Sequence, residues 1–171
     1  NSINWARIIC QIVYYFYAFF KVGKQNISFS VPTGNFGDVF AGYMAKKMGL
    51  PIDKLIVATN ENDILQRVIN TGVYKPDKVK PSLSPSMDIQ VSSNFERLLF
   101  YILDEDDKKV ASLMHDLKTK GFFRLRQESL NIIKKDFCAE KINDKETLAI
   151  IKKLNIESKF ILDPHTATAF G

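Results

Sequence analysis

The sequence predicts an α/β fold with a parallel-strand βαβ core and several additional helices. An apolar run over residues 27–31 leads into a turn with two glycines, and a helix-like apolar periodicity follows over 37–48. A second strand-like run at 54–59 comes directly after the helix-ending sequence GLP at 49–51. A strand, a helix and a strand at this spacing form one unit, whose two strands pair in parallel through a right-handed crossover.

Helices account for most of the remaining chain. Residues 4–21 are apolar nearly all round, which predicts a buried helix that ends at Gly23. A short helix is expected from Asn62 or Asp63 through Asn70, followed by a long loop over 73–93 that is rich in proline and serine. The pattern then predicts helices that begin near Phe95, at about 107–120 and 127–135, and after Asp144 as N-cap, and a last strand at 159–162.

Size, charge and cysteine usage exclude several classes of protein. With 171 residues, 46% of them apolar, the chain can form one core but not two full domains. Its net charge of +5 comes mostly from scattered lysines without a basic block, so we expect no nucleic-acid partner. The apolar segment 8–20 is too short to span a bilayer. Cys10 and Cys138 lack the spacing of a disulfide framework or a zinc site, which fits a reducing compartment and hence a cytoplasmic protein.

The glycine turn after the first strand is the main candidate site. A strand, a glycine turn and a helix start direct several backbone N–H groups toward one spot, and the helix dipole there also favours an anion such as phosphate. Gly34 and Gly37 would let the backbone approach that ligand without a Cβ in the way. A plain βα turn, with Asp38 as a first-turn helix acid, is the structural alternative. The spacing matches neither a dinucleotide fingerprint nor a Walker loop, which leaves a nucleotide-binding βαβ domain as the weaker alternative.

Five phrases along the chain resemble the threonine synthase family, in its bacterial and fungal branch. They are NSINWAR at 1–7, VPTGNFGD at 31–38, ATNEND at 58–63, SPSMDI at 84–89 and DPHTA at 163–167. The resemblance implies a fold-type II architecture, with residues 1–171 as a single cofactor-binding portion from the C-terminal part of a larger lyase that acts in threonine biosynthesis. It also implies pyridoxal 5'-phosphate as cofactor and the conversion of O-phospho-L-homoserine and water to L-threonine and phosphate.

The resemblance also implies roles for individual residues. The cofactor phosphate would be held by the turn at Gly34, Asn35, Phe36 and Gly37. The pyridine nitrogen would be bound by the hydroxyl of Thr166. The substrate phosphate would be bound by Asn1, Ser2 and Arg7, where the arginine fork suits a phosphate dianion. Thr166 as a helix N-cap and Arg7 as a surface or ion-paired residue are the alternatives. His165 fits either a catalytic group or a hydrogen-bonded structural histidine, and Asp88 and Glu96 fit only loop and helix-capping chemistry.

The family's Schiff-base lysine is expected upstream of the first phrase, so no catalytic residue is assigned within this chain. We therefore expect the chain to be truncated at both ends, to be inactive alone, and to need the missing N-terminal part of the same enzyme as its partner. The alternative is a non-catalytic remnant that binds phosphate or pyridoxal phosphate.

Overall fold

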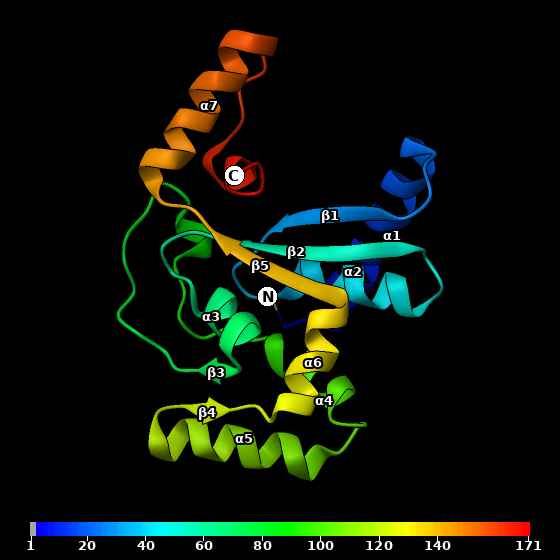
Figure 1. The fold of residues 1–171 in the computed structure, drawn as a ribbon, viewed down its shortest axis with the longest axis vertical. Coiled ribbons are helices and arrows are strands. Elements are labelled where there is room, and N and C mark those ends of the chain that lie inside the picture. Colours follow the sequence, from blue (N-terminus) through cyan, green and yellow to red (C-terminus); the bar gives the residue numbers. More distant parts are fainter. Residues whose placement is uncertain (1–2) are drawn as a thin grey trace.

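The predicted βαβ core is present in the computed structural model, which describes residues 3–171. It consists of β1 (Ile27–Pro32), α2 (Gly37–Lys47) and β2 (Ile52–Thr59). A further strand, β5 (Phe137–Lys141), pairs with the other side of β2. Both strand pairs are parallel, so β2 is the central strand of a three-stranded sheet (Figure 1). The α/β prediction is therefore confirmed.

The other elements surround this sheet. They are α1 (Trp5–Val22), α3 (Ile64–Thr71), β3 (Val73–Tyr74), the 3₁₀ helix η1 (Pro85–Met87), α4 (Phe95–Ile102), α5 (Asp107–Lys120), β4 (Phe123–Arg124), α6 (Gln127–Asp136), α7 (Asp144–Ser158) and α8 (Pro164–Thr168). β3 and β4 form a separate two-stranded antiparallel sheet. Helices α2 to α6 lie on one side of the three strands in Figure 1, whereas α7 and the C-terminal end lie on the other. Apart from β3 and η1, the segment 73–93 that was expected to be a long loop is irregular.

Aromatic side chains fill the core between the sheet and the helices α2 and α4. Phe36 packs edge-on against Phe95, with ring centroids 5.3 Å apart, and also contacts Phe137 of β5. Phe40 is fully buried among the same elements. Because Phe36 belongs to the glycine turn, the core extends directly beneath the candidate site.

The prediction of a buried helix at 4–21 is correct for the helix and wrong for its burial. Within α1 only Ile8 and Tyr15 are buried, while several large apolar side chains are exposed. An apolar pattern all round a helix predicts contact with other groups on every side. In this chain one side of α1 packs on α2, and no described element covers the other side.

Two further expectations are also corrected. Residues 159–162 are irregular rather than a strand, because the strand beside β2 is β5, which the sequence pattern did not predict. Asn143, not Asp144, is the N-cap of α7: its side chain accepts from the N–H of Glu146, whose carboxylate in turn accepts from the N–H of Asn143.

No helix among residues 3–171 is long and apolar enough to cross a membrane.

Candidate functional site

The glycine turn lies at the carboxyl end of β1 and leads straight into α2. Phe36 is the N-cap of α2 and has a left-handed backbone, with φ at 63°. For a bulky residue this conformation costs about 1–2 kcal/mol. The Phe36 ring is only 1% exposed, and burying such a side chain stabilises by about 1.5–3 kcal/mol. Core packing therefore fixes the shape of the turn.

The amide groups at the start of α2 are available to a ligand. The first helical bond of α2 runs from the N–H of Phe40 to the carbonyl of Phe36. Within residues 3–171, the N–H groups of Gly37, Asp38 and Val39 have no acceptor. Three adjacent donors at a helix N-terminus form an anion-binding arrangement.

The carbonyl groups of the turn are occupied by another segment. The carbonyl of Gly34 accepts from Ser92 Oγ at 3.1 Å. The carbonyl of Asn35 accepts from the backbone N–H and the side-chain amide of Asn94, at 3.1 and 2.9 Å. A trans peptide places its C=O and N–H on opposite sides, so the N–H groups of Asn35 and Phe36 face away from these partners. The turn thus directs donors rather than acceptors away from the 92–94 segment.

Gly34 is required by a close approach and not by its backbone angle, because it is absent from the positive-φ residues. A Cβ at this position would lie 2.9 Å from the carbonyl oxygen of Ser86 and 3.2 Å from Met87 Cα. Both are backbone atoms of the η1 segment, which cannot swing aside as a side chain can. The sequence argument expected a Cβ to disturb the ligand, and the structure gives a second reason for a glycine.

A cavity of about 260 Å³ lies at this turn. Its walls include residues 32–39 together with Arg7 and Gln11 of α1 and Ser86 of η1. The structure therefore brings together the predicted phosphate turn and the predicted phosphate-binding arginine. Arg7 is exposed and also lines a neighbouring hollow of about 330 Å³, so its guanidinium can reach an anion on either side.

Sequence reasoning missed two residues of this cavity. Gln11 follows Arg7 by one helical turn, so a polar residue on the same face of an apolar helix was the available signal. Ser86 lies far from the turn in sequence, and only its place in the SPSMDI phrase marked it.

Asp38 places a carboxyl group beside the anion-binding amides. Its Oδ1 atom is buried and has no hydrogen-bond partner within the described residues. Burial raises the pKa of Asp38, and the nearby Tyr15 hydroxyl offsets part of that rise. The Tyr15 hydroxyl donates to the backbone carbonyl of Asp38 at 2.9 Å. A raised pKa favours the neutral carboxyl, which repels an anion less than a carboxylate does.

Thr166 lies outside the walls of this cavity, near the start of α8. Asp163 is the N-cap of α8, so the alternative of Thr166 as N-cap is wrong. The Asp163 carboxylate accepts from the hydroxyl of Thr166 at 2.5 Å and from its N–H at 3.2 Å. His165 Nε2 accepts from the N–H of Ser86 at 3.3 Å, which connects α8 to the wall of the cavity.

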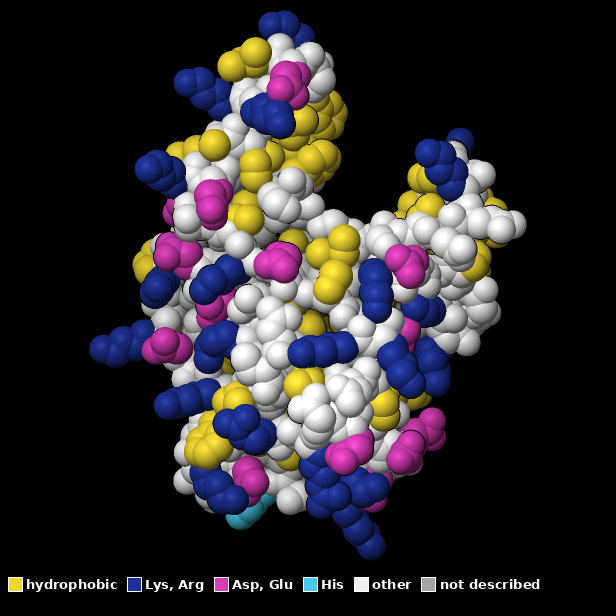
Figure 2. Space-filling model, viewed as in Figure 1, with side chains coloured by type: hydrophobic (Ala, Val, Ile, Leu, Met, Phe, Trp, Pro, Cys, Tyr) yellow, Lys and Arg dark blue, Asp and Glu magenta, His cyan; other side chains and the backbone are white. Residues whose placement is uncertain are grey.

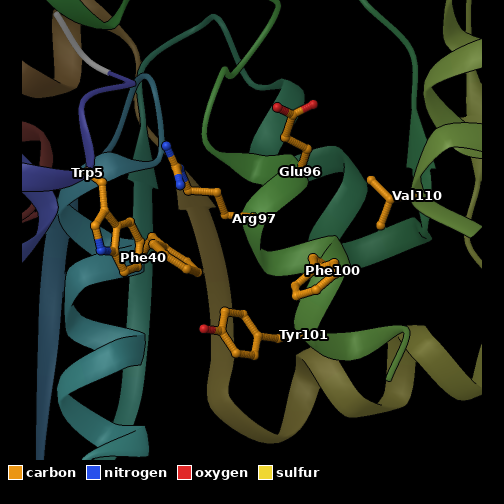
Figure 3. A pocket seen from close by; sticks show the side chains of 7 residues that line it. All are labelled: Trp5, Phe40, Glu96, Arg97, Phe100, Tyr101 and Val110. Carbon is orange, nitrogen blue, oxygen red and sulfur yellow. The ribbon is translucent and has the colours of Figure 1, made fainter. Parts of the chain in front are cut away.

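The first turn of α1 is fixed by contacts with α4. The predicted substrate-phosphate residues Asn1 and Ser2 lie outside the described residues. Arg97 Nη2 donates to the carbonyl of Ile3 at 2.7 Å, and its guanidinium lies 5.2 Å from the Trp5 ring centroid. Figure 3 shows Arg97 directed toward Trp5, with Glu96 pointing away. These residues line a hollow of about 440 Å³. These contacts hold the beginning of the helix that carries Arg7.

Comparison with known proteins identifies one family. Threonine synthase from Saccharomyces cerevisiae is 50% identical over 98% of this chain, and so is that from Pseudomonas aeruginosa. The chain belongs to the threonine synthase family. It spans about a third of these relatives (36% of each) and corresponds to their C-terminal part. A scan of protein-family models finds no match.

Solved structures agree with the sequence comparison. A structure of pyridoxal phosphate-bound threonine synthase from Brucella melitensis superposes on 99% of this chain with a TM-score of 0.97 and 50% identity. Yeast threonine synthase gives a TM-score of 0.94 at 48% identity over the same share. The chain covers 37% of each of these two structures. The predicted fold-type II architecture is therefore confirmed.

Proposed function

We propose that this chain forms the phosphate-binding part of a pyridoxal phosphate enzyme, which converts O-phospho-L-homoserine and water to L-threonine and phosphate. The three acceptor-free amides of Gly37, Asp38 and Val39 beside the cavity are the observation that carries the proposal. They fit the cofactor phosphate in charge and in geometry. When bound, the cofactor supplies the electron sink of the reaction.

The residues of this chain bind and orient in this proposal. The turn at Gly34, Asn35, Phe36 and Gly37 holds the cofactor phosphate through its backbone N–H groups. Arg7 holds the substrate phosphate across the cavity, with Asn1 and Ser2 as further donors. The Thr166 hydroxyl faces the pyridine nitrogen once the rest of the enzyme is in place. The Schiff-base lysine belongs to the part upstream.

The N-terminal part of the same enzyme is the proposed partner, and exposed apolar side chains support a contact surface for it on this chain. Figure 2 shows α7 and the end of α1 as two projections with an open notch between them, and hydrophobic side chains on the α7 projection. The exposed large apolar side chains of α1 and α7 are Trp5, Ile9, Val13, Tyr14, Tyr17, Phe20, Val22, Leu148 and Ile156. Apolar patches of this kind mark interaction surfaces. In this proposal residues 1–171 act as one cofactor-binding portion of a cytoplasmic enzyme without nucleic-acid or membrane partners.

The test compares two glycine variants of the full-length protein that carries this chain. Gly34→Ala forces a Cβ against the backbone of Ser86, so the affinity for pyridoxal phosphate should fall by about tenfold or more, or about 1.4 kcal/mol or more. Gly121→Ala is the matched control, because Gly121 ends α5 with φ at 78°, where a Cβ is strained, and no atom lies within 4 Å of that Cβ. It should lower the thermal midpoint and leave the affinity nearly unchanged.

Turnover separates the two functions. If the wild type forms threonine from O-phosphohomoserine, and Gly34→Ala loses this activity together with the cofactor, the result supports the proposed enzyme function. Cofactor binding by the full-length protein without any turnover supports the non-catalytic binding module. Equal affinity in the wild type and in Gly34→Ala would show that the turn is not the phosphate site.

A further inference from the structure

A polar network of buried and part-buried side chains is centred on Asp88. Oδ1 of Asp88 accepts from Asn60 Nδ2 at 2.7 Å, from Asn62 Nδ2 at 3.0 Å and from the Ser82 hydroxyl at 2.5 Å. Its Oδ2 accepts from the Ser82 N–H at 2.9 Å. Asn60 and Asn62 are each 3% exposed. One carboxylate thus satisfies four donors, and buried donors of this kind lose stability when their acceptor is removed.

The network attaches the 80–88 segment to the end of the central strand. Asn60 and Asn62 follow directly after β2. Asn62 also exchanges hydrogen bonds with the backbone of Lys80, donating to its carbonyl at 2.8 Å and accepting from its N–H at 2.9 Å. Contacts at Lys80 and Ser82 on one side and at Asp88 on the other hold the turn that contains η1. The turn can therefore not shift relative to β2 unless the network opens.

Ser86 lies inside this turn and contacts both ends of the proposed cofactor site. Its carbonyl oxygen lies so close to Gly34 of the phosphate turn that a Cβ built at Gly34 would be 2.9 Å from it. Its N–H donates to His165 Nε2 at 3.3 Å, in the helix that carries Thr166. The backbone of Ser86 is therefore one link between the phosphate turn and α8, beside the hydrogen bond from the Ser30 hydroxyl of β1 to the carbonyl of Ala169 at the end of α8.

We propose that Asp88 is a positioning residue of the cofactor site: through Asn60, Asn62 and Ser82 it fixes the η1 turn, and the η1 turn fixes the spacing between the phosphate turn and α8. This inference rests on the proposed function. Asp88 is not among the residues that line the cavity, so its effect passes through Ser86, which is.

The experiment uses the full-length protein with pyridoxal phosphate and, separately, pyridoxal without the phosphate as probes. Asp88→Ala should weaken binding of pyridoxal phosphate by about tenfold or more and shift the absorbance maximum of the bound cofactor. The ratio of the affinity for pyridoxal phosphate to that for pyridoxal should decrease, because the phosphate and the ring can no longer contact their partners at the same time. A role in fold stability alone would move neither the absorbance nor this ratio.

Asp106→Ala is the matched control. Asp106 is the N-cap of α5, and its carboxylate also accepts from backbone N–H groups, those of Lys108 and Lys109 at 3.0 and 3.1 Å. Its loss should lower the thermal midpoint with a change in cofactor affinity of less than about twofold. Equal affinities in Asp88→Ala and Asp106→Ala would overturn the inference.

A conservative variant tests the acceptor directly. Asp88→Asn keeps the size of the side chain but replaces one acceptor oxygen by an NH2 donor, so it should also bind pyridoxal phosphate more weakly than the wild type. If Asp88→Ala fails to fold, Ser82→Ala removes only one donor, and an unchanged absorbance and affinity in it would overturn the inference. If the wild type binds no pyridoxal phosphate, the proposed function itself is wrong. If the wild type binds it and Asp88→Ala binds it with the same affinity, only this inference is wrong.

Discussion

The two ends of the proposed cofactor site are built in different ways. The phosphate end consists of backbone groups held by core packing, because the N-cap residue Phe36 is buried against Phe95 and Phe137. The ring end depends on one hydroxyl, that of Thr166, on a helix of five residues. Apolar side chains on both sides of this helix, Phe160 and Phe170, are each 61% exposed.

The difference indicates which end this chain completes by itself. Backbone donors at the start of α2 are fixed as soon as the core forms, since moving them would expose Phe36. The Thr166 hydroxyl instead donates to its own N-cap, Asp163, and would have to turn toward a ring that another part of the enzyme helps to hold. We therefore expect the phosphate end to tolerate little change, and the ring end to respond mainly in the complete enzyme.

The largest effect is expected for Phe36→Ala in the full-length protein. Deleting this buried ring should lower the free energy of unfolding by about 3–5 kcal/mol, and with it the affinity for the phosphate. Phe160→Ala and Phe170→Ala, at the ring end, should change it by about 0.5 kcal/mol or less if these side chains stay exposed. Denaturant unfolding measures all three variants. Large losses in the ring-end variants would instead show that the N-terminal part buries them.

Arg7→Leu should come next. Losing a charged contact to the substrate phosphate removes about 2–4 kcal/mol of transition-state binding, which is about a 30- to 900-fold fall in kcat/KM for O-phosphohomoserine. The absorbance of the bound cofactor should change little, because the turn holds the cofactor through backbone groups. A substrate analogue without the phosphate is the control and should be nearly indifferent. Loss of the cofactor before loss of the substrate would assign Arg7 a structural role.

Local patterns in the sequence predicted the elements that depend on near neighbours. Gly34 and Gly37, between a strand-like and a helix-like run, were sufficient to predict the turn between β1 and α2, and its role in binding phosphate stays a prediction. The burial of α1 was wrong because an apolar pattern does not say which part of a protein covers it. The strand predicted at 159–162 was wrong and β5 was missed for a related reason: a strand needs a partner, and β5 pairs with a strand from far back in the sequence.

The candidate site shows the same limit. The cavity joins Arg7, the glycine turn and Ser86, and no spacing rule connects residues so far apart in the sequence. Asp88 fitted only loop chemistry in the sequence because two of its four donors come from Asn60 and Asn62, far back in the chain, and the other two from Ser82 within the same irregular segment. A turn can be predicted from its own residues, whereas the segment that closes over it can only be seen in the folded chain.

A smaller effect is expected at the ring end from Thr166→Val. This change removes the hydroxyl with little change in shape, so it should cost about 0.5–1.5 kcal/mol of cofactor binding and shift the cofactor absorbance. Thr168→Val is the control on the same helix, where the hydroxyl donates only to the carbonyl of Pro164 at 3.0 Å. Thr166→Ser should behave as the wild type does. Indistinguishable spectra for the two valine variants would remove Thr166 from the site.

The smallest effects concern pH, and they differ in sign between the two ends. Burial raises the pKa of Asp38, so the folded state holds this proton more tightly than the unfolded state does. Stability from this group therefore falls as the pH rises from about 4, the unfolded pKa, through the raised value. Asp38→Asn avoids the loss, and should be more stable than the wild type at neutral pH and equal to it at low pH.

Asp163 should behave in the opposite way. Its hydrogen bonds from the Thr166 hydroxyl and backbone N–H lower the pKa of Asp163, so its contribution is present above the unfolded pKa and is lost as the pH falls through the lowered one. Asp163→Asn should therefore be less stable than the wild type at neutral pH, by a small amount because the carboxylate is exposed. Thermal unfolding of the two variants between about pH 2 and pH 8 measures both differences. The difference for Asp38→Asn should approach zero below about pH 4, and that for Asp163→Asn only as the pH falls through the lowered pKa. Differences of the same sign at neutral pH would mean that the two carboxyl groups have similar surroundings in the complete enzyme, and that the contrast between the two ends does not survive assembly.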